Sequence, residues 1–214
     1  MTKCPYCNHT VNEKARFCEN CGAILQRNDP AYQLAYTHRL EMEGRLAEAI
    51  TEYEKLIEKS GQGEQLPSVR KHLGNLHFRM GHLRRAKMHL RAACDTEPGN
   101  AALWHDLGVV EYHAAEFDNA IAAFQEALVR DPDLLLAYFW LGNALYHRGR
   151  NHEAIEAFGE LLDRYPNFIV GHFHLGVIHA RRGNVAEAES HFRRVLQKNP
   201  EAAAAQFYVT PESS

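Results

Sequence analysis

Four cysteines stand close together at the start of the chain. Cys4, Cys7, Cys18 and Cys21 form two Cys-x-x-Cys pairs with ten residues between them, and the fifth cysteine, Cys94, lies far along the chain. Paired Cys-x-x-Cys turns are typical zinc ligands, and four thiolates complete a tetrahedral site. A thioredoxin-like dithiol needs one Cys-x-x-Cys in a βαβ unit, so it is the weaker interpretation, beside iron. We therefore predict one Zn²⁺ held by these four cysteines.

The predicted zinc has a structural role. Four protein ligands leave no open position for an activated water, which metal catalysis requires. Residues 1–25 are too few to build a sufficient core, so metal binding would supply the folding energy, about 10 to 16 kcal/mol in comparable peptides. Asn8 and Gly22 follow the two turns, and we expect them at positive φ, where amide groups can face the sulfurs.

Composition limits the class of protein. The chain has 214 residues, of which 45% are hydrophobic and 24% charged, as in a soluble globular protein of one or two domains. The first residues, MTKCPYC, lack the apolar run of a secretory signal, and no stretch approaches the roughly 20 apolar residues of a membrane span. These features predict a cytoplasmic protein, where thiols stay reduced. A net charge of -3 gives no general attraction to nucleic acid or membranes.

Most of the chain repeats with a period of 34 residues. The repeat is visible in five columns of residues. They are Leu73, Leu107, Leu141 and Leu175; the glycine after each; Ala86, Ala120, Ala154 and Ala188; Leu90, Phe124, Phe158 and Phe192; and Pro98, Pro132, Pro166 and Pro200. Apolar residues within each unit fall three and four apart, which predicts two helices per unit.

Small residues mark how the two helices meet. A break is expected near Gly81, Ala115, Gly149 and Gly183, and the proline ends the second helix. The glycine after each column leucine lies inside the first helix, where it costs about 1 kcal/mol relative to alanine. We therefore predict a close approach of the paired helix at this glycine.

These columns resemble the tetratricopeptide repeat (TPR). Its W-x2-L-G-x2-Y, A-x3-F, P pattern is matched by Trp104, Leu107, Gly108, Ala120, Phe124 and Pro132, with Glu111 in place of the tyrosine. The resemblance implies an all-α fold, a right-handed α-solenoid of about five helix pairs. The units are 30–63, which is divergent, 67–100, 101–134, 135–168 and 169–202. A short linker, 26–29, precedes them, and a capping helix and tail, 203–214, follow. The cysteine-rich stretch, with CPYC and FCENCG, is similar to short zinc ribbons of prokaryotic proteins.

Other residues that could do chemistry are interpreted as structural. His172 and His174 lie two apart on a helix and should point in different directions. His105 and Asp106 resemble a hydrolase dyad, but neighbouring helical residues are also expected to diverge. Cys94 is predicted to be a buried thiol. No phosphate-binding loop or nucleophile elbow is present, so we do not expect an enzyme.

In TPR proteins the first helix of each unit lines the concave face, which implies a peptide-binding groove here. The groove residues carried over from the repeat positions are Lys71, Asn75, Phe78, Arg79, His105, Val109, Tyr112, His113, Phe139, Asn143, Tyr146, His147, Phe173, Val177 and Arg181; the first unit adds Leu34, His38, Glu41 and Met42. An aromatic and weakly cationic surface favours an acidic peptide or protein with apolar anchors. We expect a monomer or a weak homodimer.

Three alternatives remain open. A carboxylate clamp for a chaperone C-terminus is matched by Lys71 and Asn75, but Asp106, Leu136 and Trp140 replace its other residues. In a nucleic-acid-associated factor the ribbon would recognise the nucleic acid, although the ribbon carries no basic patch. A regulatory subunit of a larger assembly would be similar to the bacterial lipopolysaccharide-assembly regulators, which join TPRs to a rubredoxin-like domain; their membrane anchor and their opposite domain order are not found in the sequence.

Overall fold

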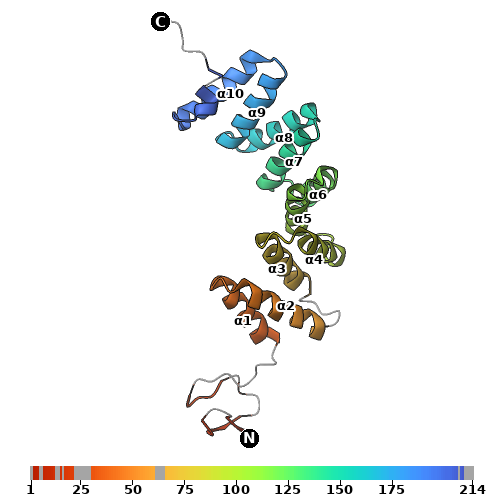
Figure 1. Cartoon of the computed structure of the whole chain (residues 1–214), viewed down its shortest axis with the longest axis vertical. Helices are drawn as coiled ribbons and strands as arrows, with labels where there is room; N and C mark the ends of the chain where they lie inside the picture. The colour runs from red at the N-terminus through yellow and green to blue at the C-terminus, as the bar shows by residue number, and fades with distance from the viewer. Residues whose placement is uncertain are drawn as a thin grey trace. The chain divides into compact units, whose positions relative to one another are not determined.

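The computed structural model describes residues 2–4, 7–12, 15, 17–21, 30–60, 66–206 and 208–209 (Figure 1). It divides into two compact units, 1–82 and 83–214. The predicted linker 26–29 and Gly22 lie outside the described residues, so the predicted domain boundaries stay a prediction. Within the described part, no helix is both long enough and apolar enough to cross a membrane.

The first unit contains a small hairpin and three helices. Strands β1 (Thr2–Lys3) and β2 (Thr10–Val11) pair antiparallel, with Thr2 opposite Val11. Helix α1 spans Pro30–Met42, α2 spans Leu46–Ser60 and α3 spans Leu66–Arg79. Helix α2 packs on both α1 and α3 around fully buried Tyr53 and Leu73. The hairpin has a core of its own, formed by Cys4, Val11 and Cys18.

The second unit is a succession of helices, each of which packs on the next. They are α4 (Leu83–Thr96), α5 (Ala101–His113), α6 (Phe117–Arg130), α7 (Leu135–His147), α8 (Asn151–Arg164), α9 (Ile169–Arg181), α10 (Val185–Lys198) and α11 (Ala203–Gln206). Outside the hairpin, the described chain is built of helices, as the period of 34 residues predicts (Figure 1).

The predicted close approach at the column glycines is confirmed. A Cβ atom on Gly108 would lie 2.7 Å from the ring of Phe124, and one on Gly142 would lie 2.7 Å from the ring of Phe158. Gly176 faces Phe192 in the same way, at 2.8 Å. The column glycine of the first helix is therefore in direct contact with the column phenylalanine of the second helix, and this contact allows the two helices to pack closely.

The breaks between paired helices are also where the sequence places them. Gly149 and Gly183 have φ values of 76° and 78°, in the left-handed region that favours glycine. The same turn between α5 and α6 is made by Ala115, at φ 58°. There the amide of Glu116 donates to the carbonyl of Glu111 at 2.9 Å, which closes the helix end as a Schellman motif does.

Candidate functional site

The four ribbon cysteines converge on one point. Their sulfur atoms all lie within 4.8 Å of one another. The Sγ atoms of Cys4 and Cys21 are 3.7 Å apart, and those of Cys7 and Cys18 are 3.5 Å apart. Thiolates bound to one zinc at about 2.3 Å in a tetrahedron lie about 3.8 Å from one another. The donor set and its spacing therefore fit the predicted metal.

The hairpin backbone favours deprotonation of the Cys7 thiol. Asn8 has the positive φ expected of it, 59°, and the amide of Cys4 donates to the carbonyl of His9 at 2.8 Å. A backbone hydrogen bond from His9, assisted by the side chain of Asn20, lowers the pKa of Cys7 to about 6. A thiol that loses its proton easily is a good metal ligand, since the thiolate is the form that binds.

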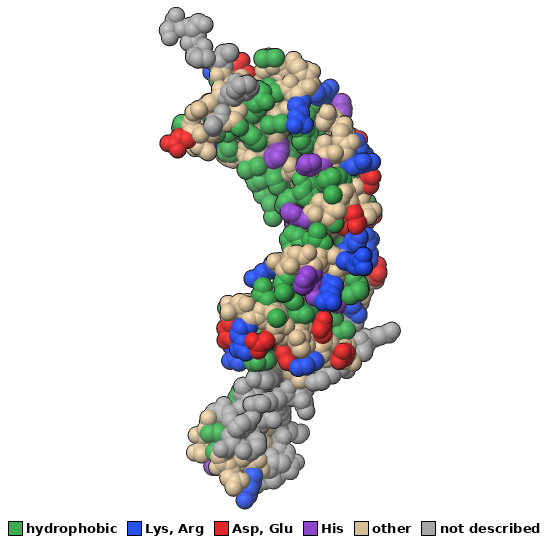
Figure 2. Space-filling view, in the orientation of Figure 1, with side chains coloured by type: hydrophobic (Ala, Val, Ile, Leu, Met, Phe, Trp, Pro, Cys, Tyr) green, Lys and Arg blue, Asp and Glu red, His purple; other side chains and the backbone are tan. Residues whose placement is uncertain are grey.

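The second unit carries most of the predicted groove residues, on α5, α7 and α9. Figure 2 shows hydrophobic side chains over α7 and α9, with histidines among them. Leu136 and Val170, one repeat apart on the first turns of α7 and α9, are each 47% exposed. Both occupy the second position of their repeats, which belongs to the groove positions, and they were missing from the predicted residues.

Aromatic rings continue this surface. Tyr112 on α5 contacts Trp140 on α7 edge to face, with ring centroids 5.1 Å apart, and it also contacts His147. The guanidinium of Arg181 lies 5.1 Å from the ring centre of Tyr146. Because these side chains are partly buried or exposed and come from neighbouring first helices, they form one accessible aromatic surface in the second unit.

Two groups of predicted groove residues are placed differently. Asn143 is only 5% exposed, and its side-chain amide nitrogen donates to the carbonyl of Phe139 on the same helix. Its side chain is therefore buried and does not face a ligand. Lys71, Asn75, Phe78 and Arg79 lie on α3 in the first unit. There Arg79 is 3.4 Å from Glu41, and this ion pair neutralises one of the predicted cations.

The prediction that His105 and Asp106 diverge is wrong. His105 Nδ1 and Asp106 Oδ1 are 3.2 Å apart, because both side chains bend toward the same side of α5. The structure supports the predicted role of Cys94, which is buried, and burial raises the pKa of its thiol to about 12.

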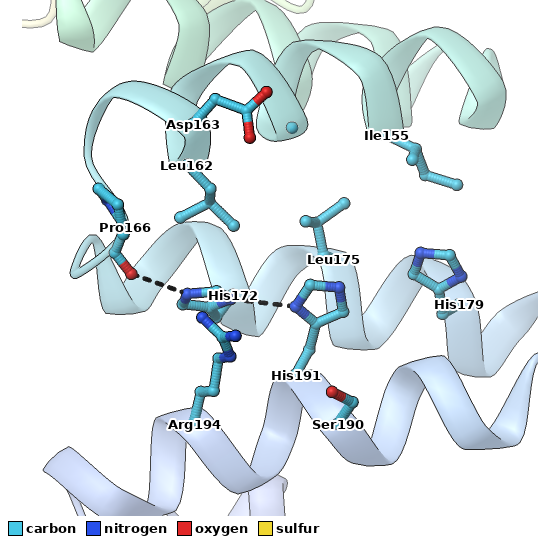
Figure 3. Close-up of a pocket in the computed structure, with 11 residues that line it drawn as sticks. Ile155, Leu162, Asp163, Pro166, His172, Leu175, His179, Ser190, His191 and Arg194 are labelled. Carbon is cyan, nitrogen blue, oxygen red and sulfur yellow. Dashed lines mark hydrogen bonds between the residues drawn. The ribbon is translucent and has the colours of Figure 1, made fainter.

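Three histidines, His172, His179 and His191, line a pocket between α8, α9 and α10 (Figure 3). Its volume is about 510 Å³. His172 on α9 donates from Nε2 to the carbonyl of Pro166 at 3.0 Å, and its Nδ1 lies 3.0 Å from Nδ1 of His191 on α10. The ring of His179 stacks on that of His191 at 5.7 Å. His172 and His174 do diverge, since His174 stacks on Phe158.

These hydrogen bonds assign the protons. A carbonyl oxygen only accepts, so His172 carries its proton on Nε2 and accepts at Nδ1 from Nδ1–H of His191. Burial, followed by the charges of His172, His179 and Arg194, lowers the pKa of His191 to about 4. Burial and Arg194 also lower the pKa of His172. Both rings are therefore neutral near pH 7.

The pocket arises from substitutions at three repeat positions. His172 stands where the unit 101–134 has Trp104, and it keeps that residue's bond, because Trp104 Nε1 donates to the carbonyl of Pro98 at 2.9 Å. Imidazole is smaller than indole, so space remains. His191 stands where that unit has Ala123, and His179 where it has Glu111. The three histidines could have been found from the sequence by searching the repeat columns for residues that differ between units, rather than for residues that the units share.

The helix pairs, the glycine-to-aromatic contacts and the period define a TPR protein. Tetratricopeptide repeat family profiles match residues 72–134, 115–167 and 170–202, and a zinc-ribbon domain profile matches residues 3–25. The chain belongs to the tetratricopeptide repeat family and begins with a zinc-ribbon domain.

Several known proteins resemble this chain. Anaphase-promoting complex subunit cut9 of Schizosaccharomyces pombe is 26% identical over 123 residues, which are 58% of this chain and 18% of cut9. The structure of MamA from Desulfovibrio magneticus RS-1 has a TM-score of 0.75 and 20% identity, over 81% of this chain and 97% of MamA. YrrB, described as a TPR protein with an unusual peptide-binding site, has a TM-score of 0.74 and 20% identity, over 85% of this chain and 92% of YrrB. At these identities the two structures establish the fold alone.

Proposed function

We propose that the protein is a non-enzymatic scaffold that binds a peptide or protein partner along the first helices of its repeats, and that its ribbon is held by one structural zinc. The observation that carries the proposal is the accessible apolar surface of α5, α7 and α9. Leu136 and Val170 are half-exposed there, beside the contact of Tyr112 with Trp140. Exposed apolar side chains that recur at the repeat period are typical of a binding face.

The charge of this surface favours an acidic partner. Among the predicted groove residues on α5, α7 and α9, Arg181 is a cation and none is acidic, whereas in the first unit the acidic groove residue Glu41 pairs with Arg79. Arg181 forms no ion pair with any residue that the structure describes and lies over Tyr146, so its charge is available to a ligand carboxylate. The partner's apolar side chains would supply most of the affinity, because interface energy concentrates in buried aromatic and aliphatic anchors.

The relatives support a scaffold of this kind. YrrB is described as having a peptide-binding site, and cut9 is a subunit of a multiprotein complex. The finer features, the acidic partner and the monomeric or weakly dimeric state, rest on the residues of this chain.

The test is affinity capture with variants that introduce negative charge on the proposed face. Leu136→Glu with Val170→Glu places two carboxylates on the proposed face, and both sites are exposed enough for the helices to keep their core. We expect partners captured by the wild type to be lost, or their binding weakened at least about tenfold. Val129→Glu on α6, where Val129 is 79% exposed, is the matched control and should retain them.

Two results would contradict this proposal. Equal capture by the double variant and by Val129→Glu would show that the first helices are not the binding face. Steeply salt-dependent binding of DNA or RNA, lost when the ribbon is unfolded, would favour the nucleic-acid-associated alternative.

A further inference from the structure

The pocket lined by His172, His179 and His191 is separate from the proposed partner surface. His172, Leu175 and His179 lie three and four residues apart and share one face of α9, and all three line the pocket. Phe173 and Val177, which belong to the predicted groove, lie on the opposite face of the same helix. A ligand in the pocket and a partner on the groove would therefore touch different residues.

One wall of the pocket is apolar and another is cationic. Ile155 and Leu162 from α8 and Leu175 from α9 form the apolar part. Arg194 and Ser190 come from α10, one helical turn apart, and therefore lie on the same side of that helix (Figure 3). Arg194 forms no ion pair with any residue in the described part of the chain. The pocket thus presents a guanidinium that forms no ion pair beside an apolar surface, and the carboxylate of Asp163 belongs to the same lining.

The electrostatic environment favours an anion. Arg194 acts on both His172 and His191, and no carboxylate of the described residues is among the groups that shift the pKa of either ring. The acidic residue of the lining, Asp163, comes from α8, whereas Arg194 comes from α10. A positive charge next to two neutral imidazoles disfavours a metal cation. One guanidinium matches the single charge of a carboxylate, with bidentate geometry, better than the double charge of a phosphate.

We propose that this pocket binds a small organic carboxylate, with its charged group on Arg194 and Ser190 and its apolar body on Leu162 and Leu175. The volume of about 510 Å³ lies within the range of small-molecule sites. The ligand also neutralises the charge that acts on the histidines. Protonation of His191, which faces His172 and His179 from α9, Arg194 from α10 and Asp163 from α8, becomes easier when the ligand is bound.

The test is calorimetric titration of the full-length, zinc-loaded chain with hexanoate at pH 7. We expect saturable binding of one hexanoate per chain, with a Kd below about 1 mM. Acetate, which lacks the apolar body, should bind at least about tenfold more weakly. Inorganic phosphate should give no saturable heat. Absence of saturable hexanoate binding would overturn the proposal.

Neighbouring arginines provide a matched pair of variants. Arg194→Gln should weaken hexanoate binding about tenfold or more, because the charged hydrogen-bond donor is lost. Arg193→Gln lies on the same turn of α10, but Arg193 is already paired with Glu189 at 2.7 Å, so this variant should bind as the wild type does. Equal binding by the two variants would overturn the assignment.

A pocket-filling variant tests the location. His172→Trp with His191→Ala recreates the arrangement of Trp104 and Ala123, which the repeat already accommodates. This variant should keep its helical circular dichroism and lose hexanoate binding. Retained binding would place the carboxylate elsewhere. Uptake of a second zinc by the zinc-loaded chain that is lost in His191→Ala, without hexanoate binding, would identify a metal site instead.

An NMR titration of the histidine Cε1–H signals supplies an independent readout. Saturating hexanoate should raise the pKa of His191 above its ligand-free value of about 4, because the charge of Arg194 is neutralised. The Arg194→Gln variant should show no further rise on addition of hexanoate. An unchanged His191 pKa in the wild type at saturation would contradict binding beside Arg194.

Discussion

Glu111 is a carboxyl group inside the second unit, at the repeat position where the TPR pattern has tyrosine. Its side chain is 0% exposed, and Oε1 accepts from Nη2 of Arg91 on α4 at 2.8 Å. Oε2 has no hydrogen-bond partner among the described residues. Burial raises the pKa of Glu111, and Arg91 opposes this effect. The residue therefore depends mainly on one hydrogen-bonding partner, Arg91, for the compensation of its charge.

Removal of Arg91 should expose this dependence. Arg91→Gln is expected to lower the free energy of unfolding by about 2 kcal/mol at pH 7, because a buried carboxylate loses its partner. A raised pKa means that the folded state binds the proton before the unfolded state, so stability rises as the pH falls through that range. The loss should consequently be smaller at pH 5 than at pH 7, in urea titrations at both values.

Two variants complete the measurement on Glu111. Adding Glu111→Gln to Arg91→Gln removes the charge and should recover most of the lost stability. Arg193→Gln breaks a half-exposed i,i+4 pair and should change stability by less than about 0.5 kcal/mol. A loss from Arg91→Gln that is identical at pH 5 and pH 7 would show that the Glu111 charge is not its cause.

Among the helices, glycines distinguish contact from conformational preference. Gly142 on α7 meets Phe158, whereas a Cβ on Gly159, in the middle of α8, would meet nothing within 4 Å. Neither residue is among those with positive φ. Both replacements by alanine gain the same helix propensity, so any difference between them reports the packing of the aromatic ring.

Gly142→Ala should therefore destabilise the protein by about 2 kcal/mol, since the added methyl would overlap the ring of Phe158. Gly159→Ala should stabilise it by about 0.5 to 1 kcal/mol. Thermal unfolding followed by circular dichroism gives both values. Similar stabilisation by the two variants would mean that the α7–α8 pair can accommodate a Cβ atom at Gly142, which would contradict the predicted steric overlap.

The sequence predicted these helices because their contacts recur in register. Gly108 and Phe124, or Gly149 at a turn, could be assigned from the spacing alone, and so could the four thiols of the ribbon. The contact of His105 with Asp106 depends on side-chain rotamers, which no spacing specifies. The pocket of His172 and His191 depends on a side chain smaller than the repeat usually has. The exchanged residues are visible in the repeat columns, but the size of the space follows from packing between three helices, which the spacing does not specify.

Across the whole molecule, the ribbon and the repeats have separate sources of order. Among the described residues of the ribbon, Cys4, Val11 and Cys18 are buried, and two of them are predicted metal ligands. The helices of the second unit enclose a large apolar cluster around Phe124 and Phe158. At the end of this unit, Tyr208 stacks on Phe192 with centroids 4.7 Å apart and covers the last helix pair.

Loss of the metal should therefore affect the ribbon alone. We expect one zinc per chain by elemental analysis, and Cys18→Ser or a strong chelator should release it and unfold residues 4–22. The helical circular dichroism signal and its melting temperature should be almost unchanged. A metal-free chain whose ribbon amides remain protected from hydrogen exchange would contradict this prediction.

At the fourth position of units 101–134 and 169–202, and again at Gln206, different side chains make the same hydrogen bond, whereas the intervening unit has Tyr138 at this position. Trp104 and His172 both donate to the carbonyl of the preceding repeat's proline, and Gln206 donates in the same way to Pro200 at 2.5 Å. An alignment scored by residue type records three unrelated amino acids in this column. Each of these side chains nevertheless donates an N–H hydrogen bond to the same kind of acceptor, a proline carbonyl. In designed repeat proteins this position could therefore be varied, provided that the side chain keeps an N–H donor. A smaller donor at this position would leave a cavity between the chosen repeats.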